Sequence, residues 1–316
     1  MSAITTDNPL HAESGSFRIV DTLRPSPGVD YPQDALELLD RFGGESDCAA
    51  LVERLRFPRG FVCPSCECRR TPWRSGTGLI ACPECRAPTA VTERALFHGS
   101  RIMLTTWFRA IWRWLESDRL VTAEELRAWL DIRDERRAAI YLGQLRALLA
   151  LDDDRPLRGE VVIAKATLAG PEGPSVVVAI EQKQAAGGRI RMQRLRRGNA
   201  GEILRFAAAV VAPGSLVVTP PWKGLSALRS MGFHHKHRTS SLGLPSAGDP
   251  QAIWAEARVW LGEPLPPEAE LQGAIDELVF RHNRRDTEVG LRWHRVMALA
   301  VSYPRRLSAA LRNVGT

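Results

Sequence analysis

The chain has 316 residues, of which 44% are hydrophobic, and its formal net charge at pH 7 is +7. This length favours two or three domains, and no run approaches the roughly 20 apolar residues of a membrane-spanning helix, so we expect no membrane partner. The basic balance suits a polyanion, most often nucleic acid. All six cysteines lie between positions 48 and 85, which fits a reducing cytoplasm better than a disulfide-rich secreted protein.

Residues 1–30 are rich in Ser, Pro and Gly and show little hydrophobic periodicity, which predicts a disordered lead. The segment 31–56 is predicted to form two short helices. Asp34 and Ser46 are the expected N-caps, and the Gly43-Gly44 pair separates the helices.

The next segment, 57–95, carries the motifs CPSC at 63–66 and CPEC at 82–85, separated by 15 residues. Two such pairs supply four thiolates for one tetrahedral zinc ion, and the stretch between them is long enough for a β-hairpin. We therefore predict a zinc ribbon, with zinc in a structural role, whose ligands are Cys63, Cys66, Cys82 and Cys85. Two disulfides in a secreted domain are the alternative, and the sequence leaves open whether Cys48 or Cys68 takes part.

Residues 96–150 are predicted to form a helical block. Apolar residues recur at helical spacing through 101–118, Thr122 and Glu125 form a capping box, and a last helix is expected at about 134–149. This order is compatible with a helix-turn-helix. The basic side chains that would then meet DNA phosphates are Arg133, Arg136, Arg137 and Arg146. A plain helical bundle with a solvated basic face is the alternative.

From residue 158 the hydrophobic period becomes that of β-strands. Three runs, GEVVIAKATL, PSVVVAIEQK and RIRMQRL, precede a helix at about 199–211 and a fourth strand, SLVVTP. Further helices are expected at about 250–261, 266–284 and 290–313. Three sequential strands, a helix, a strand and then helices is the element order of an RNase H-like α/β domain. We place this domain at 158–286 and a C-terminal helical extension at 287–316.

Polar clusters in this half of the chain have more than one interpretation. Three aspartates at 152–154 are interpreted as a solvated loop. The segment HHKHR at 234–238 is interpreted as a basic surface that contacts DNA, with a metal site as the alternative. The arginines of RHNRR at 281–285 are expected to contact the DNA backbone or to brace the domain internally.

Several stretches between about 35 and 286 occur in the same order in one family of proteins. They include ALELLDRFG, the FVCPSC knuckle, GEVVIAKATLAG and VAPGSLVVTPPWKG, and the most telling are WKG at 222–224 and FRHNRR at 280–285. On these stretches the chain resembles the transposases of a group of bacterial insertion sequences that have an N-terminal zinc ribbon and an ISXO-like catalytic domain. The resemblance implies an RNase H-like fold, double-stranded DNA as the partner and, because such transposases act as multimers on paired DNA ends, a homodimer.

Transposases of this family cut and join DNA with carboxylates that bind two magnesium ions. At the position of the first acid this chain has Ala164, followed by Lys165, and at that of the second it has Pro220. Neither alanine nor proline offers a metal ligand, and Lys165 puts a positive charge where a cation would sit. We therefore expect no catalytic residue at these positions and no bound magnesium.

The third metal-site position of the family falls in PQAIWAEARVWLG, at 250–262. There Ile253 or Ala255 would occupy the site, and Glu256 lies one residue out of register. A rebuilt one-metal site that uses Glu160 is the alternative.

These observations predict a catalytically inactive DNA-binding protein derived from an insertion-sequence transposase. We expect it to act in the cytoplasm, on the nucleoid, as a regulator or structural factor. The predicted DNA contacts are Arg133, Arg136, Arg137, Lys223, Lys236, Arg238, Arg284 and Arg285. The alternatives are an active magnesium-dependent transposase or nuclease with displaced acids, and a scaffold whose basic face contacts protein.

Overall fold

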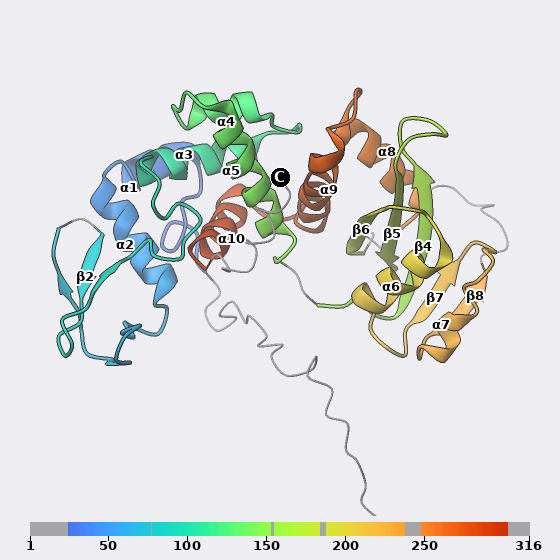
Figure 1. Cartoon of the computed structure of the whole chain (residues 1–316), viewed down its shortest axis with the longest axis horizontal. Coiled ribbons are helices and arrows are strands. Elements are labelled where there is room, and N and C mark those ends of the chain that lie inside the picture. The colour runs from blue at the N-terminus through green and yellow to red at the C-terminus, as the bar shows by residue number, and fades with distance from the viewer. Residues whose placement is uncertain (1–24, 77, 153–154, 184–187, 238–247, 303–316) are drawn as a thin grey trace, which may run out of the picture.

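Helices and strands separate into two lobes in the computed structural model (Figure 1). The structure describes residues 25–76, 78–152, 155–183, 188–237 and 248–302. One lobe holds a short three-stranded sheet and a group of helices, and the other is built on a five-stranded sheet. The predicted disordered lead lies largely outside the described residues. Its last part, 25–30, forms a turn in which Asp30 accepts a hydrogen bond from the N–H of Ser26.

Two short helices, α1 (Ala35–Arg41) and α2 (Glu45–Arg56), open the helical lobe. Asp34 caps α1 as predicted, because its carboxylate accepts a backbone N–H in the first turn. The prediction that Ser46 caps the second helix is wrong. The N-cap of α2 lies two residues earlier, at the extended Gly44, which makes no side-chain hydrogen bond.

The next helix, α3 (Leu104–Glu116), receives its cap from a distant part of the chain. Its own N-cap residue, Met103, makes no side-chain cap hydrogen bond. The carboxylate of Glu45, in the first turn of α2, accepts the N–H groups of Leu104 and Thr105 at 2.8 and 3.2 Å. Two amides that would otherwise lack a partner are thereby satisfied, and α2 is tied to the start of α3.

The ribbon contains three antiparallel strands where the sequence predicted one hairpin. They are β1 (Trp73–Arg74), β2 (Leu79–Ala81) and β3 (Pro88–Ala90), with β2 in the centre. Ile80 and Thr89 pair across β2 and β3 and are buried. Ile80 belongs to the same apolar core as residues of α2 and α3, so the ribbon packs on the helical lobe.

The helical lobe is completed by α4 (Ala123–Trp129), α5 (Glu135–Leu149) and the C-terminal α10 (Val289–Val301). Tryptophans dominate its core, and those fully buried include Trp107, Trp112, Trp114 and Trp293. Trp293 of α10 lies with its ring 5.3 Å from that of Phe108 on α3. The described part of the predicted C-terminal extension is therefore a component of this core. Beyond residue 302, the rest of the predicted helix falls outside the described residues.

The second lobe is a mixed sheet with the strand order β6-β5-β4-β7-β8. The strands are β4 (Glu160–Thr167), β5 (Ser175–Glu181), β6 (Ile190–Leu195), β7 (Leu216–Thr219) and β8 (His234–His237). Strands β4, β5 and β6 pair antiparallel, whereas β7 is parallel to β4 and β8 is parallel to β7. Strand β8 was not predicted, and it occupies most of the segment HHKHR that was interpreted as a basic surface.

Helices cover both faces of this sheet. Helix α6 (Ala200–Val210) and the short α7 (Ala227–Ser230) share a core with Val161, Ile163 and Val217 on one face. Helices α8 (Pro250–Leu261) and α9 (Glu268–Asn283) pack on the opposite face with Ala164 and Val178. Because successive side chains of β4 point to opposite faces of the sheet, the strand contributes side chains to two apolar cores.

Helix α9 also covers the outer edge of β6. The side-chain amide of Asn283 accepts the N–H of Ile190 at 2.8 Å and donates to its carbonyl at 3.1 Å. Gln272 accepts the N–H of Arg194 at 2.8 Å. These amides pair with backbone groups that a sheet edge would otherwise leave open to another chain.

Candidate metal centre and nucleic-acid interface

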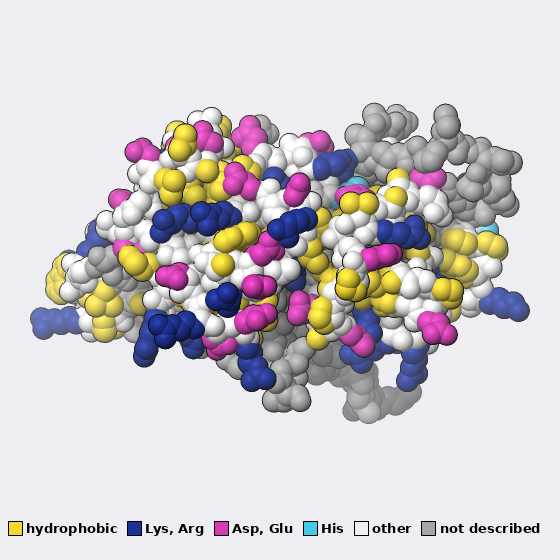
Figure 2. Space-filling model, turned by 90° about the horizontal axis from the view of Figure 1, so that it is seen from above, with side chains coloured by type: hydrophobic (Ala, Val, Ile, Leu, Met, Phe, Trp, Pro, Cys, Tyr) yellow, Lys and Arg dark blue, Asp and Glu magenta, His cyan; other side chains and the backbone are white. Residues whose placement is uncertain are grey.

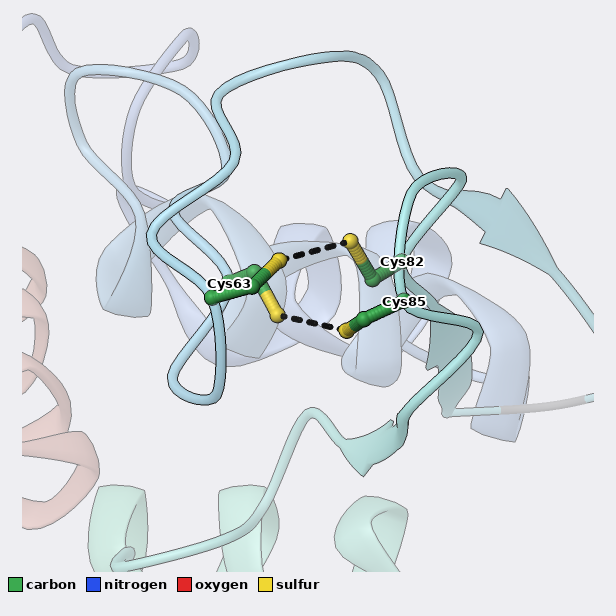
Figure 3. A group of neighbouring side chains, drawn as sticks. Cys63, Cys82 and Cys85 are labelled. Atoms are coloured by element: carbon green, nitrogen blue, oxygen red, sulfur yellow. Dashed lines mark hydrogen bonds between the residues drawn. The ribbon is translucent and has the colours of Figure 1, made fainter.

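Each CxxC pair forms a tight knuckle held by backbone hydrogen bonds. In the first knuckle the N–H of Cys63 donates to the carbonyl of Cys68, and in the second the N–H of Cys82 donates to the carbonyl of Ala87. Each turn closes through a residue of positive φ, Glu67 in one and Arg86 in the other. The two knuckles thus have the same geometry and face one another across the ribbon (Figure 3).

The four sulfur atoms lie within 4.8 Å of one another. The Sγ atoms of Cys63 and Cys85, and those of Cys66 and Cys82, are 3.6 Å apart. A disulfide would require about 2.05 Å, whereas four sulfurs about 2.3 Å from a zinc ion at the centre of a tetrahedron are about 3.8 Å apart. The arrangement therefore fits one tetrahedral zinc ion and excludes the two alternative disulfides.

Backbone amides favour ionisation of one thiol in each knuckle. Burial disfavours the thiolate of Cys82, but the N–H groups that point at its sulfur and the neighbouring thiols outweigh burial and lower its pKa to about 6. The pKa of Cys63 is lowered by the same balance. Because the thiolate is the metal-binding form, each knuckle offers one ligand prepared for zinc.

Neither of the other two cysteines joins this centre. Cys48 is buried in α2, where its thiol donates to the carbonyl of Phe42 at 3.5 Å, and burial raises its pKa to about 12. Cys68 lies outside the four-sulfur group, and its sulfur accepts the N–H of Arg70. The sequence left open whether Cys48 or Cys68 binds the zinc ion, and the structure places both outside the four-sulfur group.

The predicted basic helix divides into an exposed start and a buried end. Arg133, Arg136 and Arg137, at the beginning of α5 and in the turn before it, are exposed. Arg146 is 3% exposed, and its Nε donates to the carboxylate of Glu277 at 3.0 Å. The prediction that Arg146 contacts phosphates is therefore wrong, because its guanidinium is buried and paired with Glu277.

The segment 281–285 acts mainly as an internal brace. Arg281 donates to the carbonyls of Trp114 and Ser117, at 2.7 and 2.8 Å, where α3 ends. Arg284 donates to the carboxylate of Asp152 at 2.6 Å. We therefore assign Arg284 to the brace that the sequence analysis had considered, and leave it out of the nucleic-acid interface.

The interpretation of the aspartate run as a solvated loop is wrong for Asp152. Its side chain is 4% exposed and also accepts from Arg295 at 2.7 Å. The other two aspartates, 153 and 154, lie outside the described residues. Arg285, at the end of the brace segment, is exposed and donates to the carbonyl of His282 at 3.0 Å.

Ala164 and Pro220 come together at the carboxyl end of the parallel strands. The register that pairs Val162 with Val218 brings the two positions alongside each other, one on β4 and the other directly after β7. Ala164 is buried among apolar side chains that include Ile253 of α8. Neither alanine nor isoleucine offers the oxygen ligand that a magnesium ion requires.

Three carboxylates of this lobe, Glu160, Glu181 and Glu256, lie farther along β4 or are bound by basic groups. Glu160 begins β4 and is about 13 Å along the strand from position 164. Glu181 is buried, and the guanidinium of Arg189 and the N–H of Arg158 bind its carboxylate and lower its pKa despite burial. Glu256 on α8 is paired with His282 Nδ1 at 2.8 Å. Within the described ranges the four ribbon cysteines are the one group of three or more ligand-type side chains close enough to share a metal.

Lys165 points to the opposite face of the sheet from Ala164. Its Nζ donates to the carbonyl of Gly198 at 2.9 Å and lies 5.9 Å from the centre of the Trp222 ring. The adjacent Lys223 is exposed. Lys165 therefore holds the WKG loop against the start of α6, a role that the sequence did not reveal.

The histidine segment lies on β8, where His235 is buried and the other three residues of the strand are exposed. His235 is buried, and its Nε2 lies 2.9 Å from the Thr219 hydroxyl, while burial and the neighbouring His237 and Arg229 lower its pKa. Lys236 is exposed, and Arg238 falls outside the described residues. Charges of both signs are interspersed on the face in Figure 2, so an interface would rest on local clusters.

The comparisons with known proteins connect the ribbon to one class. Residues 43–88 match the family model of the transposase zinc-ribbon domain of the IS1595 type. Neither the curated proteins nor the solved structures include a match to the chain. The chain thus carries a transposase-like zinc ribbon in its N-terminal part. In the part of the chain that the structure describes, no helix combines the length and apolarity needed to span a bilayer.

Proposed function

We propose that this chain is a DNA-binding protein derived from an insertion-sequence transposase and that it no longer catalyses transposition. The observation that carries the proposal is the transposase zinc-ribbon match at residues 43–88. The sheet lobe supports descent from the whole enzyme. Its element order, three sequential strands, a helix and a further strand, is the order expected of an RNase H-like domain.

The inactivity that we propose follows from the surroundings of Ala164. Cutting and joining DNA with two metal ions needs carboxylates that converge on one point. At the carboxyl end of β4 and β7 the chain places Ala164 and Pro220, and α8 contributes Ile253. An apolar cluster at that point supports a protein that uses the fold for binding alone, without magnesium.

The DNA contacts that we propose lie on both lobes. Helices α4 and α5 form a helix-turn-helix-like pair. Arg133 in the turn before α5, and Arg136 and Arg137 in its first turn, are exposed at the part of a recognition helix that reaches base edges. Lys223, Lys236 and Arg285 supply exposed cations on the sheet lobe and the brace segment. We further propose that the protein binds paired DNA sites as a homodimer and acts as a regulator or structural factor.

The test is a pull-down of genomic fragments with the zinc-loaded full chain, with and without magnesium, followed by sequencing of the bound DNA and of any new ends. We expect discrete bound sites, intact DNA, and an affinity that falls as salt rises. Magnesium-dependent ends at those sites would show an active enzyme with displaced acids and overturn the inactivity. Absence of any DNA capture at low salt would leave a protein scaffold instead.

A further inference from the structure

The three-stranded sheet of the ribbon has two unlike faces. Ile80 and Thr89 are 1% and 3% exposed and point toward the helical lobe. Alternate residues of a strand point to opposite faces, so Trp73 and Leu79 lie on the other face, and they are 56% and 40% exposed. Trp73 therefore lies on the face of the sheet that is turned away from the helical lobe, and its indole is exposed to solvent.

The exposed indole stands in an apolar row. The register pairs Trp73 with Ala81, and Ala81 with Pro88, across the three strands. We call Trp73, Leu79, Ala81 and Pro88 the Trp73 face. A standard protein interface uses about 20–30 residues a side, so four apolar side chains are too few to hold a protein partner on their own.

Arginines lie at one end of this face. Between residues 54 and 94 every basic side chain other than histidine is an arginine, and they number eight. Arg69 and Arg70 lead into β1, and Arg86 leads into β3, at the same end of the sheet as Trp73, and all three are exposed. Arg70 pairs with Glu84, but both side chains are more than 60% exposed, so that ion pair is weak.

Two carboxylates of this region are engaged elsewhere, whereas Glu67 and Glu84 are exposed in the knuckles. Glu53 accepts from Arg74 at 2.8 Å, and Glu93 accepts from Arg56 at 3.2 Å, both on the side of the ribbon that meets α2. The end of the sheet beside Trp73 therefore presents cations that a polyanion can approach. A planar ring with cations around it matches a nucleotide, whose base stacks on aromatic rings and whose phosphate binds guanidinium groups.

We propose that the Trp73 face binds single-stranded DNA, with the indole stacked on an unpaired base and Arg69 and Arg86 on neighbouring phosphates. In a duplex the faces of the bases are covered by their neighbours, and an inserted side chain must first unstack them. This inference rests on the proposed DNA binding and deepens it, because it assigns the ribbon to the unpaired strand and leaves duplex contacts to α5 and the sheet lobe.

The experiment measures fluorescence anisotropy of a labelled single strand of about 20 nucleotides and of the corresponding duplex, with the zinc-loaded full chain. Trp73→Ala is expected to weaken single-strand binding by about 5- to 150-fold, the range for losing one stacked base, and to leave duplex binding within about threefold. Trp73→Phe should retain most of the affinity. Val259→Ala, at a side chain 86% exposed on α8, is the matched control and should change neither.

Three results would overturn the inference while duplex binding by the unsubstituted chain persists. The first is unchanged single-strand affinity in Trp73→Ala. The second is an equal loss for single strand and duplex with one zinc still bound. The third is a fall in oligomeric mass by light scattering without a change in DNA affinity, which would make the face a protein contact. If the unsubstituted chain binds neither form of DNA, the proposed function itself fails.

Discussion

Individual side chains in the segment 281–285 connect parts of the molecule that are far apart in sequence. Arg281 closes the end of α3, Asn283 covers the edge of β6, and Arg284 neutralises the buried Asp152. His282 is 8% exposed and pairs with Glu256 on α8. Four of the five residues of this segment therefore serve the fold, and Arg285 is the one for which we propose a contact with DNA.

Asp276 on α9 should make the protein less stable as the pH rises. Burial raises its pKa from 3.8 to about 6, although Gln272 donates a hydrogen bond to it. The folded state then holds this proton more tightly than the unfolded state, so its contribution is present below about pH 4 and is lost between about pH 4 and 6. Two pKa units correspond to about 3 kcal/mol.

We expect Asp276→Asn to raise the free energy of unfolding near pH 7.5 by about 1–3 kcal/mol and to change it little near pH 3.5. Urea unfolding at the two pH values measures this difference. Asp286→Asn, at a side chain 90% exposed, is the control and should have no effect at either pH. Equal stabilisation by Asp276→Asn at both pH values would contradict the prediction.

Among the elements, the ribbon is the one whose structure depends most on a ligand. Its three strands are two or three residues long, and a sheet of that size is marginal without a metal or a large core. The knuckles hold their sulfurs in position through a few backbone hydrogen bonds. Zinc is therefore expected to supply much of the stability of residues 57–95.

Removal of zinc by a chelator should unfold the ribbon while α8, α9 and the five-stranded sheet keep their structure. Hydrogen exchange followed by mass spectrometry measures this directly, with loss of protection expected in 61–91 and retained protection in 160–181. Cys82→Ser should give the same pattern without a chelator, and Cys48→Ser should not, because Cys48 lies outside the sulfur group. Loss of protection across both segments would mean that the lobes unfold together.

Local patterns made some elements predictable and left others hidden. The cysteine spacing, the Thr122 capping box and the β-branched runs are patterns of residues close together in sequence. The structure has a four-sulfur group at the cysteines, α4 after Thr122, and strands β4 to β6 at the β-branched runs. Strand β8 was missed because HHKH has no apolar run, and its conformation comes from pairing with β7. Arg146 was misplaced because its partner, Glu277, lies 131 residues away.

At the scale of the whole molecule, α9 and α10 hold the two lobes together. Glu277 of α9 is fully buried and accepts from Arg146 of the helical lobe, while the opposite side of α9 packs on the sheet. Trp293 of α10 then fills the centre of the helical lobe, and its Nε1 donates to the carbonyl of Phe108 at 3.1 Å. The helical lobe is therefore built from two separate stretches of chain, and the sheet lobe is the continuous stretch between them.

Trp293→Ala should destabilise the protein by about 3–5 kcal/mol, because it leaves a large cavity in the helical core. Chemical denaturation with tryptophan fluorescence and circular dichroism measures the change. Trp73→Ala, which removes an exposed indole, is the control and should stay within about 0.5 kcal/mol of the unsubstituted chain. Similar losses from the two substitutions would contradict the packing described for α10.

The place of α10 also sets an order for folding during synthesis. The Trp293 ring contacts that of Phe42, about 250 residues earlier in the chain, so the helical lobe cannot close its core until nearly the whole protein has left the ribosome. Synthesis proceeds at about 5–20 residues per second, so the tryptophans of α3 stay exposed for tens of seconds before α10 is made. The strands of the sheet lobe, which pair within about 80 residues of one another, have no such delay. A nascent chain of this protein therefore keeps the tryptophans of α3 exposed during much of its synthesis, and that is the stage at which chaperones would engage it.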